Sequence, residues 1–358
     1  MTVPSAPSGF APGVTMMAQE IAEQPTAVAR TLETLMPLRQ ELRTLAGHRR
    51  RVLLVARGSS DNAAVYGRYL LETRSGIPAA LSAPSVATHY RSELDLSDTL
   101  VVALSQSGGT DEIVATQHWA RRCGAATVAI TNDEDSPLAK EADIALVTRA
   151  GRELAVPATK SYTTQLAALA VLATALAPEP ELEDELLRVP GEMAALLETP
   201  PQVQQAVDQL AGDGPTLVVG RGLTLATALE VALKLEETCL RPVRGLSYAD
   251  LRHGPIAMVS ADTTAIVISA PDGPLVPGLT TLASDLRQLG TTVIGIGGNS
   301  EFRDACEVAI PGPALSEPLA PLGLILPPQL AIEKLARRLG LDPDAPRGLA
   351  KVTQTDRV

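Results

Sequence analysis

The stretch RVLLVARGSS (residues 51–60) joins a short apolar run to an arginine, a glycine and two serines, and a helical pattern follows as far as Arg74. An apolar run of this length with a helix directly after it is typical of a buried parallel strand. The same plan returns at PTLVVGRGLT (residues 215–224), which is followed by a helical pattern up to Cys239. The chain is therefore predicted to use one α/β plan twice.

Further apolar runs alternate with helical patterns after each of these two stretches. They lie at residues 99–104, 126–131 and 144–148 in the first half and at 264–269, 292–296 and 308–310 in the second. Strands that alternate with helices predict a doubly wound parallel sheet covered by helices on both faces. The predicted fold class is α/β, with two tandem three-layer sandwiches of the flavodoxin or Rossmann type.

The chain of 358 residues is long enough for two such domains. The boundaries predicted from composition and pattern are a disordered leader at 1–14, a helical segment at 15–46, a first domain at 47–180, linker helices at 181–213, a second domain at 214–340 and a tail at 341–358.

Composition excludes several classes of function. The net charge is −11, aromatic residues are scarce, and the basic cluster at 49–51 is short, so nucleic acid is not a predicted partner. The apolar run at 166–177 is shorter than the roughly 20 residues that a bilayer span needs, so it predicts a buried core helix and no membrane partner. No signal peptide is visible, which predicts a cytoplasmic protein. The three cysteines have no metal-type spacing, and neither a metal nor another cofactor is predicted.

Two hydroxyl-rich loops follow strands of the predicted first sheet. One is Gly58-Ser59-Ser60, and the other is Ser105-Gln106-Ser107-Gly108-Gly109-Thr110. Ligands of open α/β sheets bind at the carboxyl ends of strands, where helix N-termini favour anions. A phosphate site is one interpretation, and ordinary caps and turns are the other. Neither loop matches the P-loop or the G-x-G-x-x-G pattern.

The second half lacks such a loop but offers other candidates. Glu230, Lys234 and Glu237 form a stripe on one helix, which from spacing alone is more simply a solvated, ion-paired face. His253 lies in a predicted loop, where a histidine can act as an acid or base. Lys351 lies in the tail, and by pattern alone it is a surface lysine.

Taken together, these segments resemble the SIS (sugar isomerase) family. They are most similar to the isomerase half of glucosamine-6-phosphate synthase and to the isomerase-type glucosamine-6-phosphate deaminases. The matching stretches, in chain order, are MAQEIAEQP (17–25), LSQSGGT (104–110), AVPATKSYTTQL (155–166), ALKLEE (232–237), LRHGP (251–255) and RGLAK (347–351). The resemblance covers nearly the whole chain and implies two tandem SIS domains.

The resemblance also implies roles for individual residues. The implied phosphate-binding set is Ser59, Ser60, Ser105, Gln106, Ser107 and Thr110, with Gly58, Val156 and Ala158 as further substrate contacts. Glu237 is implied as the base that moves a proton between sugar C2 and C1. His253 is implied to assist ring opening from the neighbouring subunit of a homodimer. Lys234 and Lys351 are implied to lie at the substrate, with the tail closing on the site.

Two departures from the family bear on the reaction. The chain begins Met1-Thr2-Val3 without the glutaminase domain of the synthase, so we expect that it does not draw ammonia from glutamine. The stretches ARGSSDNA (56–63) and APSV (83–86) are closer to the deaminases. Where the family commonly has an acidic residue in the loop before the histidine, this chain has Arg244.

These observations predict deamination of glucosamine 6-phosphate to fructose 6-phosphate and ammonia. Two other reactions stay open: a lyase that acts on N-acetylglucosamine 6-phosphate, and a deglycase of fructosamine 6-phosphates. The alternative outside enzymes is a sugar-phosphate sensor. SIS-type sensors of the regulator class carry a helix-turn-helix domain, whereas residues 15–46 offer essentially one helix.

Overall fold

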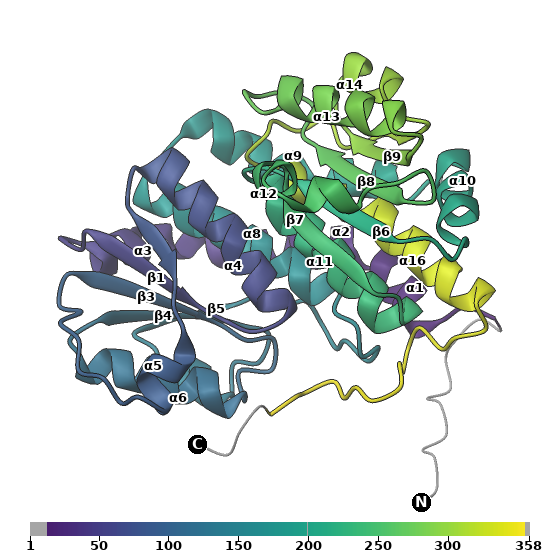
Figure 1. Ribbon diagram of the computed structural model, residues 1–358. Helices are drawn as coiled ribbons and strands as arrows, with labels where there is room; N and C mark the ends of the chain where they lie inside the picture. Colours follow the sequence, from purple (N-terminus) through teal and green to yellow (C-terminus); the bar gives the residue numbers. More distant parts are fainter. Residues whose placement is uncertain (1–12, 199, 355–358) are drawn as a thin grey trace, which may run out of the picture.

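The structure is a computed structural model that describes residues 13–198 and 200–354. It contains two five-stranded sheets, ordered β2-β1-β3-β4-β5 and β10-β9-β8-β6-β7, with parallel strand pairs throughout (Figure 1). Counted along the chain, both sheets follow the order 2-1-3-4-5, which is the flavodoxin-like form of the doubly wound fold. The predicted fold class is confirmed. We call these sheets with their helices the first unit and the second unit.

The strands lie close to the predicted runs. They are β1 (Arg51–Val55), β2 (Ala79–Leu81), β3 (Thr99–Leu104), β4 (Ala126–Thr131), β5 (Ile144–Val147), β6 (Thr216–Gly220), β7 (Val243–Ser247), β8 (Thr264–Ser269), β9 (Thr292–Gly297) and β10 (Val308–Ile310). The sequence pattern did not predict β2 and β7, which are both edge strands. Residues 242–246 were expected to form a loop, but Arg244 lies within β7, pairs with Leu217 and is exposed.

Each unit is covered by its own helices. The first has α4 (Ser59–Leu70), η2 (Leu71–Ser75), α5 (Pro84–Thr88), α6 (Asp111–Arg122), α7 (Pro137–Glu141) and α8 (Lys160–Leu176). The second has α11 (Thr224–Cys239), α12 (Tyr248–Arg252), η3 (Pro255–Met258), α13 (Val276–Gln288), α14 (Ser300–Asp304), α15 (Ala320–Leu324) and α16 (Leu326–Arg338). As predicted, α8 is a core helix, buried along nearly its whole length. In the described residues no helix is long and apolar enough to cross a membrane.

The segment before the first sheet differs from the single helix expected at 15–46. It consists of α1 (Met16–Ala22), α2 (Gln24–Leu35), η1 (Met36–Leu38) and α3 (Arg39–Ala46). Pro25 and Pro37 lie at the starts of α2 and η1, where the missing N–H of proline is tolerated but a continuous helix is interrupted. Residues 1–12 of the predicted leader lie outside the described residues.

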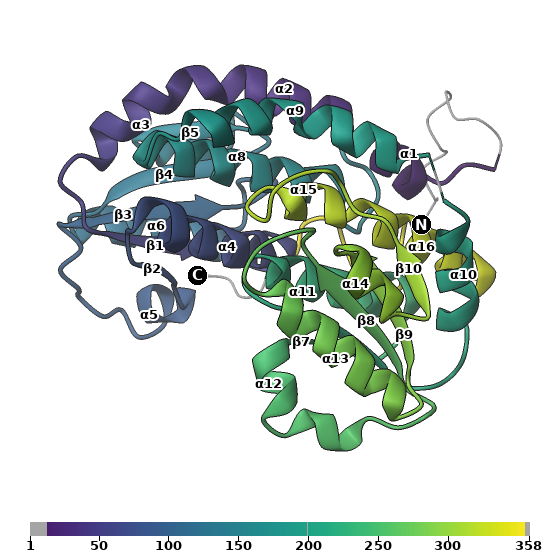
Figure 2. The ribbon, with the colours of Figure 1, turned by 90° about the horizontal axis from the view of Figure 1, so that it is seen from above.

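Helices from distant parts of the sequence join the two units. The N-terminal α2 packs against α8 and against α9 (Pro180–Leu196), and α1 packs against α16 (Figure 2). The linker region also contains α10 (Pro201–Leu210), which packs on α16. At the centre, α11 of the second unit lies against α4 of the first. One large apolar cluster runs through both units and includes residues of α4 and α11.

Candidate active site

A cavity of about 330 Å³ opens where β1 and β3 end and α11 approaches them. Every residue to which the family resemblance assigns a role, except His253, lines it. These residues are Gly58, Ser59, Ser60, Ser105, Gln106, Ser107, Thr110, Val156, Ala158, Lys234, Glu237 and Lys351. A wider and more open hollow of about 1190 Å³ lies along α5 and α6, and none of these residues lines it. We therefore take the smaller cavity as the candidate active site.

Two helix N-termini meet at one end of the cavity. Helix α4 starts after Gly58 and helix α6 after Thr110, and neither of these two N-cap residues caps its helix with its own side chain. The first backbone N–H groups of a helix lack partners inside the helix, and the helix dipole favours negative charge there. Together with the surrounding hydroxyl groups, this arrangement is suited to an anion such as phosphate.

The loop after β3 is held in shape by its own serine. The Ser105 hydroxyl accepts the Gly108 N–H at 3.2 Å and lies 3.3 Å from the Thr110 hydroxyl. Gly108 has φ +59°, and a Cβ atom there would lie 2.2 Å from the Ser136 Oγ. Only glycine therefore allows the loop to pack this closely against the start of α7.

The two serines at the start of α4 have different partners. The Ser60 hydroxyl accepts a hydrogen bond of 3.0 Å from the buried Gln165 amide, which also lines the cavity. The Ser59 hydroxyl instead lies near Glu230 of α11 and helps to lower the pKa of that carboxyl. Gln165 lies within the AVPATKSYTTQL stretch, but only the packing of α8 against α4 brings it to Ser60. It was not singled out from the sequence.

Two residues of the charged stripe on α11, Glu230 and Lys234, are buried and Glu237 is half-buried, which corrects the simpler interpretation of the stripe as a solvated face. The Lys234 side chain is 1% exposed, and its Nζ lies 3.5 Å from Oε1 of Glu230, which is fully buried. Lys234 also donates to Oε2 of Glu237, the carboxylate of the stripe that lines the cavity. Glu230 and Lys234 are buried because α11 packs against α4 of the first unit.

The charges of this stripe stabilise one another. Burial alone would lower the pKa of Lys234, but Glu230 and Glu237 raise it above its ordinary value. Burial raises the pKa of Glu230, although Lys234 and a 2.8 Å hydrogen bond from Asn62 oppose this. Lys234 is therefore charged, and it holds Glu237 at the cavity.

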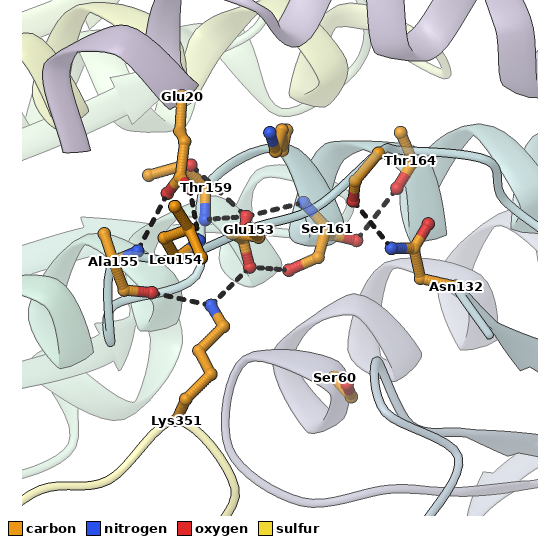
Figure 3. A network of polar contacts seen from close by, with 12 residues as sticks. Glu20, Ser60, Asn132, Glu153, Leu154, Ala155, Thr159, Ser161, Thr164 and Lys351 are labelled. Atoms are coloured by element: carbon orange, nitrogen blue, oxygen red, sulfur yellow. Dashed lines mark hydrogen bonds and ion pairs between the residues drawn. The ribbon is translucent and has the colours of Figure 1, made fainter. Parts of the chain in front are cut away.

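The tail covers the cavity and is tied to it at two points. Lys351 Nζ donates to Glu153 Oε2 at 2.6 Å and to the Ala155 carbonyl at 2.8 Å (Figure 3). Gln354 Nε2 donates to the Gly109 carbonyl at 3.0 Å, and its Oε1 accepts the Asp111 N–H at 3.1 Å. The tail thus bridges the loop before α8 and the start of α6.

Glu153 is a second residue that sequence reasoning missed. It is buried, and it also accepts hydrogen bonds from the Thr159 N–H at 3.0 Å and the Ser161 hydroxyl at 2.6 Å (Figure 3). Burial alone would raise the pKa of Glu153, but Lys351 and the donors of Ser161 hold it below its ordinary value. A single glutamate just before the stretch at 155–166 shows no sequence pattern from which its burial could be predicted.

Glu20 on α1 supports the same loop from behind. Its carboxylate accepts the backbone N–H groups of Leu154 and Ala155 (Figure 3). Burial raises the pKa of Glu20 to about 7, with a further contribution from Glu153, while the Leu154 N–H and the lysines nearby oppose the shift. Ionised Glu20 therefore destabilises the fold, and protonated Glu20 does not.

We expect Glu20 to make stability depend on pH. The stabilisation by protonated Glu20 is fully present below the ordinary pKa of 4.5 and is lost as the pH rises through about 7. The free energy of unfolding should change by about 3 kcal/mol across this range. From pH 5 to pH 8, the urea midpoint of wild type should decrease relative to the midpoint of Glu20→Gln. Glu33→Gln, at an exposed position of α2, should follow wild type. Parallel pH profiles for wild type and Glu20→Gln would contradict this assignment.

The structure does not bring His253 to the cavity of its own chain. His253 is exposed at the C-terminal end of α12, and it is absent from the described residues that line the cavity. Arg244 on β7 is likewise outside the lining. Within residues 13–198 and 200–354, no group of three His, Cys, Asp or Glu residues is placed to hold a metal ion.

Comparisons with known proteins agree with this arrangement. The chain is 33% identical over 349 residues to a glutamine–fructose-6-phosphate aminotransferase (isomerizing) of Thermococcus kodakarensis, covering 94% of this chain and 57% of that protein. It therefore spans less than two thirds of that relative. The C-terminal domain of the glucosamine-fructose-6-phosphate aminotransferase of Francisella tularensis superposes with a TM-score of 0.86 at 25% identity, over 94% of this chain and all of that domain.

A candidate phosphosugar isomerase of Silicibacter pomeroyi has 33% identity and a TM-score of 0.83, over 92% of this chain and 100% of that structure. The model of the SIS domain matches residues 45–175 and 210–302, which cover both units. The chain belongs to the SIS domain family.

Proposed function

We propose that the protein acts on an amino-sugar 6-phosphate, and that it converts glucosamine 6-phosphate and water to fructose 6-phosphate and ammonia. One observation carries the proposal. A single cavity is lined by residues at the N-termini of α4 and α6, by hydroxyl groups and by Glu237, which is held by Lys234. The relatives named for fructose-6-phosphate aminotransfer support a sugar of this class.

In the proposed reaction, the phosphate end anchors the substrate and orients its carbon chain. Glu237 removes the proton from C2 of the open-chain aldose and returns a proton to C1. When one N–H proton also passes to the oxygen at C1, the aldehyde becomes a hydroxymethyl group and the amine at C2 becomes an imine. Water then adds to the imine carbon, and the nitrogen leaves as ammonia, which gives fructose 6-phosphate. The ammonium of Lys234 keeps the Glu237 carboxylate in place during both proton transfers.

Opening the sugar ring is assigned in this proposal to His253 of a second subunit. Its exposure at the end of α12, away from the cavity of its own chain, is compatible with such a role. Light scattering on the active preparation tests it directly. A homodimer is expected, and an active monomer would contradict a histidine shared between subunits.

The size of the cavity favours a substrate without a large group on nitrogen. At about 330 Å³ it lies near the lower end of the range for ligand sites, which begins at roughly 300 Å³. A fructosamine 6-phosphate carries a further amino-acid-sized group on its nitrogen, so the deglycase fits less well. The sensor alternative does not need Glu237, Lys234 and Lys351 around one cavity.

The deciding experiment incubates the purified protein separately with glucosamine 6-phosphate and N-acetylglucosamine 6-phosphate. Ammonia and fructose 6-phosphate from the free amine are the expected products. Loss of one water from the acetylated sugar, without ammonia, would identify the lyase instead. If neither substrate reacts although phosphate sugars bind, the sensor replaces the enzyme.

A further inference from the structure

Arg57 connects the two loops at the anion end of the cavity. Arg57 lies between the end of β1 and Gly58, and it lines the cavity. Its Nε donates to Oε2 of Glu112 at 2.9 Å and its Nη2 to Oε1 of Glu112 at 2.8 Å. Glu112 lies in the first turn of α6, and its side chain is 5% exposed. This two-pronged contact fixes the plane of the guanidinium beside the start of α6.

The guanidinium keeps donors that Glu112 does not use. An arginine side chain has five N–H groups, and the contact with Glu112 occupies one on Nε and one on Nη2. Across residues 13–198 and 200–354, Nη1 of Arg57 has no hydrogen-bond partner. The side chain is 44% exposed, so these remaining groups are accessible.

The other cations of the cavity are held by acids. Lys234 is bonded to Glu237, and Lys351 is bonded to Glu153. The hydroxyl and amide groups of the Ser105–Thr110 loop carry no charge. Arg57 is also paired with an acid, Glu112, but it directly precedes the N-cap of α4 and is bonded to the first turn of α6, so its charge lies beside both helix N-termini.

The second unit has an arginine at the corresponding position, but its surroundings differ from those of Arg57. Arg221 follows β6 as Arg57 follows β1, in the repeated R-G-x-[ST] sequence. The Arg221 guanidinium lies 4.8 Å from the centre of the Tyr248 ring. The loop after β8, at residues 270–273, has no serine and glutamine cluster. Among the described residues, Arg57 of the first unit is thus bonded to a carboxylate beside a serine- and glutamine-containing loop, whereas Arg221 of the second unit is not.

We propose that Arg57 is a specificity-determining residue that binds the 6-phosphate of the substrate through its free guanidinium edge, with Glu112 holding that edge toward the cavity. The proposal rests on the proposed function only in taking a sugar phosphate as the ligand. Glu112 thereby acts through Arg57, as a positioning residue. The hydroxyl groups of the two loops are uncharged. Arg57, although it is paired with Glu112 and interacts with Asp61, adds charged N–H donors that a phosphorylated sugar can use and an unphosphorylated one cannot.

The test measures the affinity of the purified full chain for inorganic phosphate by calorimetry. Arg57→Gln should weaken this affinity about 10- to 100-fold, as expected for the loss of a charge-assisted hydrogen bond. Arg51→Gln is the matched control. It removes the same charge from the other end of β1, where Arg51 binds Asp98, and it should bind phosphate like wild type. With glucosamine 6-phosphate, Arg57→Gln should raise KM and leave kcat nearly unchanged.

Arg57→Gln leaves Glu112 unpaired and can therefore misfold, so a second variant is tested beside it. Arg57→Lys keeps the positive charge but loses the planar fork, so an intermediate loss of phosphate affinity is expected. Wild-type phosphate affinity in both folded variants would overturn the proposal, and so would an equal loss in Arg51→Gln. Phosphate affinity is measured without turnover, so a failure of the proposed deamination would not be confused with a failure of the Arg57 assignment.

Discussion

Glu237→Gln is expected to lower turnover of glucosamine 6-phosphate by about 100- to 10,000-fold, the usual contribution of a general base. The glutamine has the same size and still offers an oxygen to Lys234, but it cannot accept a proton from C2. The anion end of the cavity is built from α4, α6 and the loop after β3, none of which contains residue 237. Affinity for inorganic phosphate should therefore stay near that of wild type.

Glu236→Gln is the matched control for this experiment. Glu236 is the preceding residue of α11, but its side chain is exposed and it does not line the cavity. Steady-state kinetics and phosphate calorimetry on both variants separate catalysis from binding. Near-wild-type kcat in Glu237→Gln would remove this residue from the role of base. An equal loss of kcat in Glu236→Gln would show that turnover depends on the negative charge of α11 in general and not on Glu237 as the base.

The sequence was sufficient to predict the central strands and the edge strands β5 and β10, but it did not predict the edge strands β2 and β7. Every residue of β3 and β4 is buried, so each appears in the sequence as a continuous apolar run. In contrast, β2 has only three residues, and β7 contains an exposed arginine and a glycine. An edge strand has one neighbour and needs less apolar surface, so the sequences of β2 and β7 resemble those of loops.

The candidate site was predictable where it follows the strands. Gly58-Ser59-Ser60 and the Ser105–Thr110 loop were placed together because parallel strands β1 and β3 end at the same edge of the sheet. Glu153 and Gln165 were not singled out, because their importance depends on contacts across the fold. Spacing also cannot distinguish a buried ion pair from an exposed one, which is why the stripe on α11 was first interpreted as a solvated face.

Lys234→Met is expected to have the largest effect on stability. Methionine has a similar length, but it leaves the fully buried Glu230 without its cation. Removing one partner of a buried pair typically costs about 3–5 kcal/mol. Glu237 would also lose the bond that holds it at the cavity, so turnover should fall in the same variant. Urea unfolding at pH 8 measures the loss of stability.

The dependence of this loss on pH identifies its cause. Burial already raises the pKa of Glu230, and Lys234 opposes the shift, so removing Lys234 should raise that pKa further. A carboxyl group with a raised pKa stabilises the fold below its ordinary pKa and loses that contribution as the pH rises. The deficit of Lys234→Met against wild type should therefore be small at pH 5 and large at pH 8. A deficit that does not change with pH would mean lost packing instead of an unpaired charge.

The double variant Glu230→Gln/Lys234→Met separates stability from catalysis. It removes the buried carboxylate together with its cation, so no isolated charge remains in the apolar contact between α4 and α11. Replacing both members of a buried ion pair is often neutral for stability, so most of the loss at pH 8 should be recovered. Turnover should stay low, because Glu237 still lacks the ammonium that positions it. Recovery of activity along with stability would show that Lys234 serves only to neutralise Glu230.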